Sequence, residues 1–362
     1  MPSLSLTGAG RSGPALSDHL GPSAVGFDAA AIIYGQNAIA ESTRRTYSAA
    51  QREFEAYCRG RDWKLQPITP QKIGNWFAHL GRTSQIASST LDTYRSAIST
   101  LHRELTMGAQ PNPASHQSVT IIIDGVKREW SAREAQRRLA KPQPIALTPQ
   151  LLEILQPHLP QEEPTASLMW AAATLGTGAV CRPSEFLGHP QKRQETALRV
   201  DAITFFAKDG VTRLAADSRA TPAHFTIRLG RTKTDQRALK APKVVANPQA
   251  VSALWRWMSV RAAYCIDSPL LFADTAGQAL AQAVLLRALG VALRSIGNTT
   301  DRITGKSFRR GGASALVAAG LSDSAVAAVG GWASVGMVQV YSDADSRAAR
   351  LIANSRKMAS RK

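Results

Sequence analysis

The sequence is poor in the residues that build disulfides and metal sites. Its three cysteines, Cys58, Cys181 and Cys265, are far apart, odd in number and form no CxxC pair, which argues against a disulfide framework or a zinc knuckle. The seven histidines are scattered, none follows His224, and neither an HExxH motif nor a histidine pair at helical ligand spacing occurs. We therefore expect no metal and no cofactor.

Long apolar runs are also lacking. No stretch of about 18 consecutive apolar residues is present to cross a bilayer. The start, MPSLSLTGAGRSGP, has no apolar core of the kind that a secretory signal requires. The sequence thus predicts a soluble, intracellular protein without membrane attachment.

Acidic residues are scarce relative to basic ones. Asp and Glu number 26 against 44 Lys and Arg, so the 362-residue chain carries a formal charge of +18. A basic surface that serves solubility is one explanation, but an excess this large more often marks a nucleic-acid partner. The length allows two ordinary domains.

The first third of the chain divides into a leader and a helical region. Residues 1–38 are rich in Gly, Ser, Ala and Pro and predict a flexible leader. Residues 39–141 show helical periodicity, and the clearest apolar stripe consists of Leu91, Tyr94, Ile98, Leu101 and Leu105. We expect a small helical domain with a positively charged face. A structural bundle with a solvated charged side fits this segment as well as a DNA-contacting domain does.

A larger domain is predicted over residues 148–362, after a linker at PQPIAL. It opens with helical patterns and continues with alternating apolar and polar positions typical of strands, with Gly210 at a predicted hairpin turn. The alternating apolar positions are Val200, Ile203, Phe205, Phe225, Ile227 and Leu229. The rest predicts helices, with a tail from about residue 343. The expected fold class is mainly α with a small antiparallel β-sheet.

Four basic or nucleophilic residues occur in an order that suits phosphodiester chemistry. Cleavage without metal needs cations on the non-bridging oxygens, an in-line nucleophile, and an acid for the departing 5′ oxygen. Arg182 in CRPSEF and Arg309 in GKSFRRGG supply guanidinium forks. Arg182 is expected to open a helix, whose dipole would attract an anion. Lys233 in RTKTDQ follows the alternating segment, and a crowd of cations would lower its pKa enough for an acid role.

Tyr341 is the candidate nucleophile, nine positions after Trp332. A tyrosine with its usual pKa of about 10 needs activation, which two arginines and a lysine provide by stabilising the phenolate. Each of these residues alone is better explained by exposure or core packing. The run between Arg309 and Trp332 also fits a helix-turn-helix DNA reader. The conjunction of all five favours the catalytic interpretation.

These motifs resemble those of the tyrosine recombinases, or phage integrase family, over roughly residues 40 to 350. The helical region resembles the family's core-binding domain, and the rest resembles its α+β catalytic domain of the DNA breaking-rejoining type. The resemblance assigns catalytic positions to Arg182, Lys233, Lys306, Arg309, Trp332 and Tyr341, with Glu185 at a supporting acidic position. One position departs from the family, since Lys306 stands where the family has histidine, and a protonated lysine cannot accept a proton.

The resemblance implies a site-specific recombinase or integrase that serves a mobile element. Tyr341 would attack a DNA phosphate to form a 3′-phosphotyrosyl link, and Lys233 would protonate the leaving 5′ oxygen, without ATP or metal. The implied partners are double-stranded DNA and three further copies in a homo-tetramer on paired sites, in the cytoplasm or nucleoid of a prokaryote or the nucleus of a eukaryote. Alternatives are a catalytically impaired, recombinase-derived DNA-binding protein, a type IB topoisomerase-like relaxing enzyme, and a basic helical scaffold with no DNA role.

Overall fold

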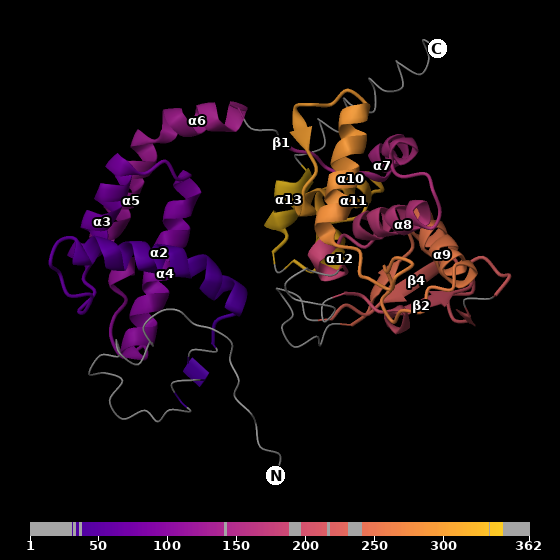
Figure 1. Ribbon diagram of the computed structural model, residues 1–362, viewed down its shortest axis with the longest axis horizontal. Coiled ribbons are helices and arrows are strands. Elements are labelled where there is room, and N and C mark those ends of the chain that lie inside the picture. The colour runs from indigo at the N-terminus through magenta and orange to yellow at the C-terminus, as the bar shows by residue number, and fades with distance from the viewer. Residues whose placement is uncertain are drawn as a thin grey trace. The chain divides into compact units, whose positions relative to one another are not determined.

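The chain divides into two compact units, Met1–Ala140 and Lys141–Lys362, in a computed structural model (Figure 1). The structure describes these residues: 31, 34–35, 38–140, 143–187, 197–215, 218–230, 241–332 and 334–342. The predicted leader lies outside this set except for four of its positions, and the predicted tail lies outside it entirely. Within the described part, no helix combines the length and apolar character needed to cross a membrane.

The first unit is a small helical bundle. Its helices are α2 (Glu41–Arg59), α3 (Pro70–Thr83), α4 (Ser88–Thr106), α5 (Gln117–Glu129) and α6 (Ser131–Ala140), with a 3-10 turn at Pro113–Ser115. Helix α2 packs on α4, and α3 packs on α5. Both pairings join apolar stripes, which bury their side chains only when they face one another.

An aromatic cluster forms the centre of this bundle. The fully buried Trp76 ring lies 5.2 Å from the Phe54 ring, 5.1 Å from Phe77 and 5.6 Å from Tyr94, which stacks parallel to it. Such offset and stacked pairs add to the free energy of plain burial. Thr69 begins α3 by accepting a 3.3 Å hydrogen bond from the amide of Lys72, so the helix starts at Pro70.

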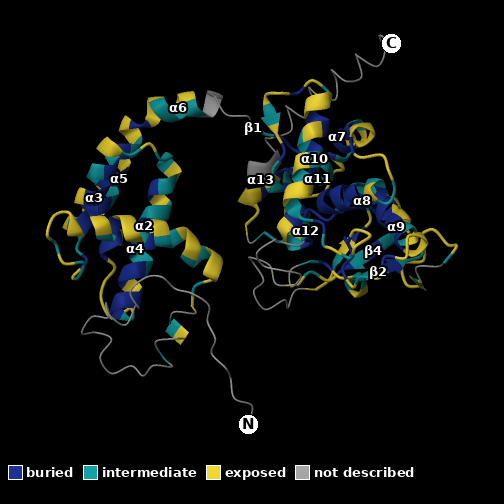
Figure 2. Cartoon of the chain, in the orientation of Figure 1, coloured by how far each residue is buried: buried dark blue, intermediate teal, exposed yellow. Residues whose placement is uncertain are grey.

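The second unit combines seven helices within the described residues with a four-stranded sheet. The helices are α7 (Pro149–Leu155), α8 (Thr165–Gly178), α9 (Pro248–Ala263), α10 (Gln282–Ser295), α11 (Gly305–Ala318), α12 (Asp323–Gly330) and α13 (Gly336–Ser342). Helix α8 is apolar on all sides and occupies the core against α9, as its dark colour in Figure 2 shows. The predicted fold class, mainly helical with a small antiparallel sheet, is confirmed.

The sheet has the order β3-β2-β4-β5, and every pairing is antiparallel. Its strands are β2 (Ile203–Phe206), β3 (Arg213–Leu214), β4 (His224–Ile227) and β5 (Lys243–Val245). Phe205, Phe225 and Val245 are paired across three strands and buried, so this row faces the core. Gly210 has a φ of +75° in the β2–β3 turn, as predicted. The expected strand position Val200 is wrong, because that residue lies in a 3-10 turn at Val200–Ala202.

The segment predicted as a linker belongs partly to the core of the second unit. Strand β1 (Gln143–Pro144) pairs in parallel with β6 (Asp301–Arg302), and residues 145–147 are fully buried. The Leu147 amide donates to the carbonyl of Ser307 at 2.9 Å, and the Leu147 carbonyl accepts from Thr177. A Cβ on Gly311 would lie 1.8 Å from that carbonyl oxygen. Helix α11 therefore packs directly on this segment, and the glycine of the RRGG motif makes the approach possible.

Candidate active site

A small apolar cluster joins the elements that carry the predicted catalytic residues. Its buried members are Val180, Ala313, Val326, Ala327 and Val338. Val180 precedes Arg182 by two positions, Ala313 lies one turn after Arg309 on α11, and Val338 lies on α13, the helix of Tyr341. Motifs that are far apart in the sequence are thus held together by a single patch of packing.

Arg182 follows α8 in a tight turn. Val180 has a φ of +54°, which is unusual for a β-branched residue and redirects the chain out of the helix. The Glu185 carboxylate accepts hydrogen bonds from the Arg182 amide at 3.0 Å and from Arg182 Nη1 at 3.1 Å. The expected helix start is only the single 3-10 turn Pro183–Glu185. A helix dipole sums over successive aligned turns, so a single turn offers little of the predicted attraction for an anion.

Arg309, which lies much later in the chain, binds the same carboxylate. It lies on α11, is 3% exposed, and donates from Nη2 to both oxygens of Glu185, at 3.0 and 3.2 Å. One buried negative charge therefore stands between two guanidinium groups and offsets their repulsion. The two arginines and Glu185 together keep a net charge of +1, and Arg182 remains partly accessible, with 29% of its side chain exposed.

Trp332 lies beside Arg309. Gly331, with a φ of 66°, ends α12 in the left-handed conformation and brings Trp332 back toward α11. The guanidinium carbon of Arg309 is 5.8 Å from the centroid of the half-buried Trp332 ring, near the outer limit of a cation–π contact. A Cβ on Gly330 would lie 2.6 Å from the same ring, so any other residue here would displace Trp332.

Lys306 lies in the first turn of α11, three residues before Arg309. Thr304 and Ser307 close that turn, with a 2.9 Å hydrogen bond from the Thr304 amide to Ser307 Oγ. Lys306 itself is exposed and forms no hydrogen bond or ion pair with the other described residues. Its ammonium is therefore available to an external anion, whereas Arg309 on the same turn is covered.

Two predicted catalytic residues lie wholly or partly outside the described part of the structure. Lys233 lies between β4 and β5, outside the described residues. Tyr341 lies on α13, which packs on α11 and α12, but its side chain is outside the described set. The described site therefore comprises Arg182, Glu185, Arg309 and Trp332, with Lys306 at its edge.

Sequence reasoning missed Lys243. This residue begins β5, and its Nζ donates to the carbonyl of Ala179 at 3.1 Å and to that of Val329 at 2.8 Å. The ammonium also lies against the buried thiol of Cys181, next to Arg182. Burial raises the pKa of that thiol to about 11 despite the opposing effect of Lys243. No sequence pattern marks a lysine whose partners are backbone carbonyls.

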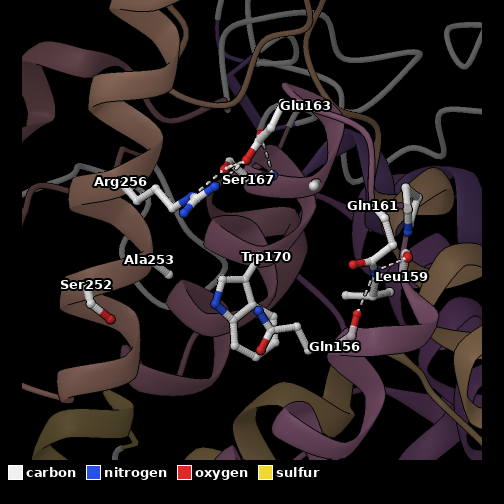
Figure 3. A pocket seen from close by; sticks show the side chains of 11 residues that line it. Gln156, Leu159, Gln161, Glu163, Ser167, Trp170, Ser252, Ala253 and Arg256 are labelled. Carbon is white, nitrogen blue, oxygen red and sulfur yellow. Dashed lines mark hydrogen bonds and ion pairs between the residues drawn. The ribbon is translucent and has the colours of Figure 1, made fainter.

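A separate cavity of about 340 Å³ lies between α8 and α9 (Figure 3). Its polar wall consists of Glu163, Ser167 and Arg256, joined by hydrogen bonds, and Trp170 lines it as well. None of the predicted catalytic residues borders it. We therefore place the candidate active site at the arginine pair.

Comparison with known proteins identifies the fold of the second unit. The second unit has the fold of a tyrosine recombinase catalytic domain, and residues 216–347 match the model of the phage integrase family, which confirms the resemblance. Residues 216–347 are thus similar to a phage integrase family domain. The matched range includes Lys233, Lys306, Arg309, Trp332 and Tyr341 and begins after Arg182.

Solved structures extend the likeness to most of the chain. A post-cleavage complex of the XerH site-specific recombinase with a palindromic difH substrate has a TM-score of 0.54 at 15% identity, covering 82% of this chain and 75% of that one. The Tn1549 transposon integrase in complex with transposon right end DNA has a TM-score of 0.55 at 13% identity, covering 89% and 96%. At these identities the likeness concerns the fold alone. No curated protein matches the chain in sequence.

Proposed function

We propose that this protein is a site-specific DNA recombinase or integrase that cuts and rejoins DNA through a phosphotyrosyl intermediate. The observation that carries the proposal is the pairing of Arg182 and Arg309 around buried Glu185, beside Trp332. Two guanidinium groups fixed in this way, with a net positive charge, suit the two non-bridging oxygens of a phosphodiester. The basic composition and the family match support a DNA substrate.

In the proposed reaction the Tyr341 oxygen attacks the phosphorus and the bond to the 5′ oxygen breaks. Arg182 and Arg309 stabilise the added negative charge of the pentacoordinate phosphate. Lys233 gives its proton to the leaving 5′ oxygen, while the phenolic proton of Tyr341 passes to solvent or a nearby base. The 5′ hydroxyl of a second strand then attacks the phosphotyrosine and releases Tyr341. The phosphodiester energy is retained, so the step balances without ATP or metal.

The proposed assembly is a homo-tetramer on two paired DNA sites, as the strand exchange requires four cleavages. Service to a mobile element fits both the family match and this chemistry. We expect the protein to be located inside the cell, together with its DNA substrate.

The test is covalent trapping on nicked duplexes. The duplexes are those that the protein selects from a random pool, together with the sequence flanking its gene, and each carries a nick that lets a short 5′-hydroxyl strand diffuse away. We expect a DNA adduct on a denaturing gel with the wild type and none with Tyr341→Phe, whose DNA affinity is retained. An adduct in the phenylalanine variant would refute the assignment of the nucleophile. Relaxation of a plasmid without exchange of strands would favour a topoisomerase.

A second candidate function is a catalytically impaired DNA-binding protein, and Lys306 is the observation that favours it. A protonated ammonium can donate to a phosphate oxygen but cannot accept the tyrosine proton. If proton acceptance limits the reaction, Lys306→His raises cleavage at neutral pH, and Lys306→Ala lowers it. Complete loss of cleavage in Lys306→His would contradict the assignment of this position. Salt-sensitive DNA binding without any adduct would establish the impaired protein.

A further inference from the structure

Lys243 occupies a point at which two helices end. Ala179 caps the C-terminus of α8, and Val329 is the penultimate residue of α12. Carbonyl groups in the last turn of a helix have no partner within that helix and carry its partial negative charge. The Lys243 ammonium donates to one such carbonyl from each helix, at 3.1 and 2.8 Å. It is therefore held by two helix termini that are 150 residues apart in the sequence.

Each of these termini leads directly into the candidate site. Arg182 lies three positions after Ala179, and Trp332 lies three positions after Val329. Because the intervening turns are short and hydrogen-bonded, a shift of either carbonyl shifts the side chain that follows it. The amides of Cys181 and Trp332, for example, are bonded at 2.9 Å to the carbonyls of Gly176 and Ala327.

The lysine also belongs to the sheet. Lys243 pairs with Ile227 across β4 and β5. Its backbone is thus held by the sheet, and its side chain holds the two helices. An ammonium with three donors suits this position, where an apolar side chain of the same length would satisfy neither carbonyl.

We propose that Lys243 is a positioning residue that sets Arg182 and Trp332 relative to one another and acts without contacting DNA. This inference rests on the proposed function for its effect on cleavage, although its effect on the structure is independent of it.

The experiment compares Lys243→Met with two matched controls in the full-length protein. Val245→Ala opens a cavity on the same strand and leaves the ammonium in place, because Val245 is buried two residues away. Lys208→Met removes a lysine charge from an exposed turn of the same sheet. For each protein we would measure the dissociation constant for nicked DNA, the single-turnover cleavage rate at saturating DNA, and hydrogen exchange of the amides at 180–182 and 330–332.

Lys243→Met should slow cleavage about 10- to 100-fold at saturating DNA, as expected for a displacement of about 1 Å in catalytic groups. Its dissociation constant should stay within about twofold of the wild type, because Lys243 contributes no DNA contact. Both amide segments should exchange faster, since each loses an anchor. Neither control should show this combination. In Lys243→Arg, a cation that still reaches either carbonyl should restore part of the rate.

The inference is overturned if Lys243→Met cleaves at the wild-type rate, or if Val245→Ala reproduces its loss, since the lysine would then serve stability alone. If the wild type forms no adduct, the proposed function fails and the exchange data decide by themselves. Faster exchange in both segments of Lys243→Met would then still support positioning. Unchanged exchange would refute it.

Discussion

Glu185→Gln is the sharpest test of the arginine pair, because it removes one charge and almost no volume. In the native protein the carboxylate accepts from the Arg182 amide, from Arg182 Nη1 and from Arg309 Nη2. A glutamine keeps one acceptor oxygen. Its amide group, however, places a donor opposite a guanidinium donor and leaves two cations without their common anion.

The magnitude follows from the burial of this pair. The Arg309 and Glu185 side chains are 4% and 7% exposed, so water cannot replace the lost partner. Removing one member of a buried ion pair costs about 3 to 5 kcal/mol, and the remaining glutamine oxygen reduces this to about 2 to 3 kcal/mol. For a unit of this size the melting temperature should fall by about 4 to 12 °C.

Glu163→Gln is the matched control. The Glu163 carboxylate also pairs with an arginine, since Arg256 Nη2 lies 2.8 Å from its Oε1, and it also accepts from a backbone amide. That arginine is 68% exposed, however, and exposed pairs contribute at most about 1 kcal/mol. Both substitutions fall in the second unit, so calorimetry of the full chain reports on the same transition.

The expected result is a shift for Glu185→Gln several times larger than that for Glu163→Gln. Equal shifts would show that the buried carboxylate stabilises the unit no more than an exposed one. The two guanidinium groups would then owe their positions to packing, and the electrostatic account of the site would be refuted.

Three further predictions concern the same unit. Burial alone would raise the pKa of Glu163, but hydrogen bonds from Arg256 and Ser167 outweigh it and lower the pKa. The stability that this carboxylate adds is therefore present above the ordinary pKa of 4.5 and disappears as the pH falls through the lower folded pKa. Urea titrations of wild type and Glu163→Gln should converge in acid and differ at neutral pH. Gly311→Ala should destabilise the unit by several kcal/mol, about 3 or more, because the new methyl group meets backbone atoms that cannot move aside; a loss below about 1 kcal/mol in denaturant titration would contradict the close packing of α11. Alkylation at pH 8 should modify exposed Cys265 and spare Cys181, whose burial raises its pKa, and equal labelling by mass spectrometry would show that the turn after α8 opens readily.

The sequence predicted the fold class, because local patterns determine it. It also named Arg182, Arg309 and Trp332 as candidate site residues, and the structure brings these three together. The stripe on α4 and the alternation in β2 and β4 each carry a period that burial requires. The contact between Arg182 and Glu185 could be predicted, because the two residues are three positions apart, although the expected helix is only a single turn. The contact between Glu185 and Arg309 could not, because Arg309 lies far along the chain and no local spacing signals it.

Other features could not be predicted because they depend on backbone atoms. Lys243 binds carbonyl groups, which every residue possesses, so its sequence context carries no sign of the contact. The linker prediction failed for a related reason. Residues 145–147 form only a short apolar run after a proline, and their burial arises from β6 and α11, which follow much later in the chain. A periodic sequence pattern shows which face of a single helix or strand is buried. The contacts of Lys243 and of residues 145–147 instead join several helices and strands that are far apart in the sequence.

The same arrangement explains how dispersed residues form one site. The cluster around Val180 and Val338 provides packing without direction, so by itself it would leave the arginines free to turn. Glu185 supplies direction, because a carboxylate accepts two guanidinium groups only in fixed geometry. Arg309 is nevertheless 3% exposed. If it holds a phosphate as proposed, DNA binding must therefore expose it.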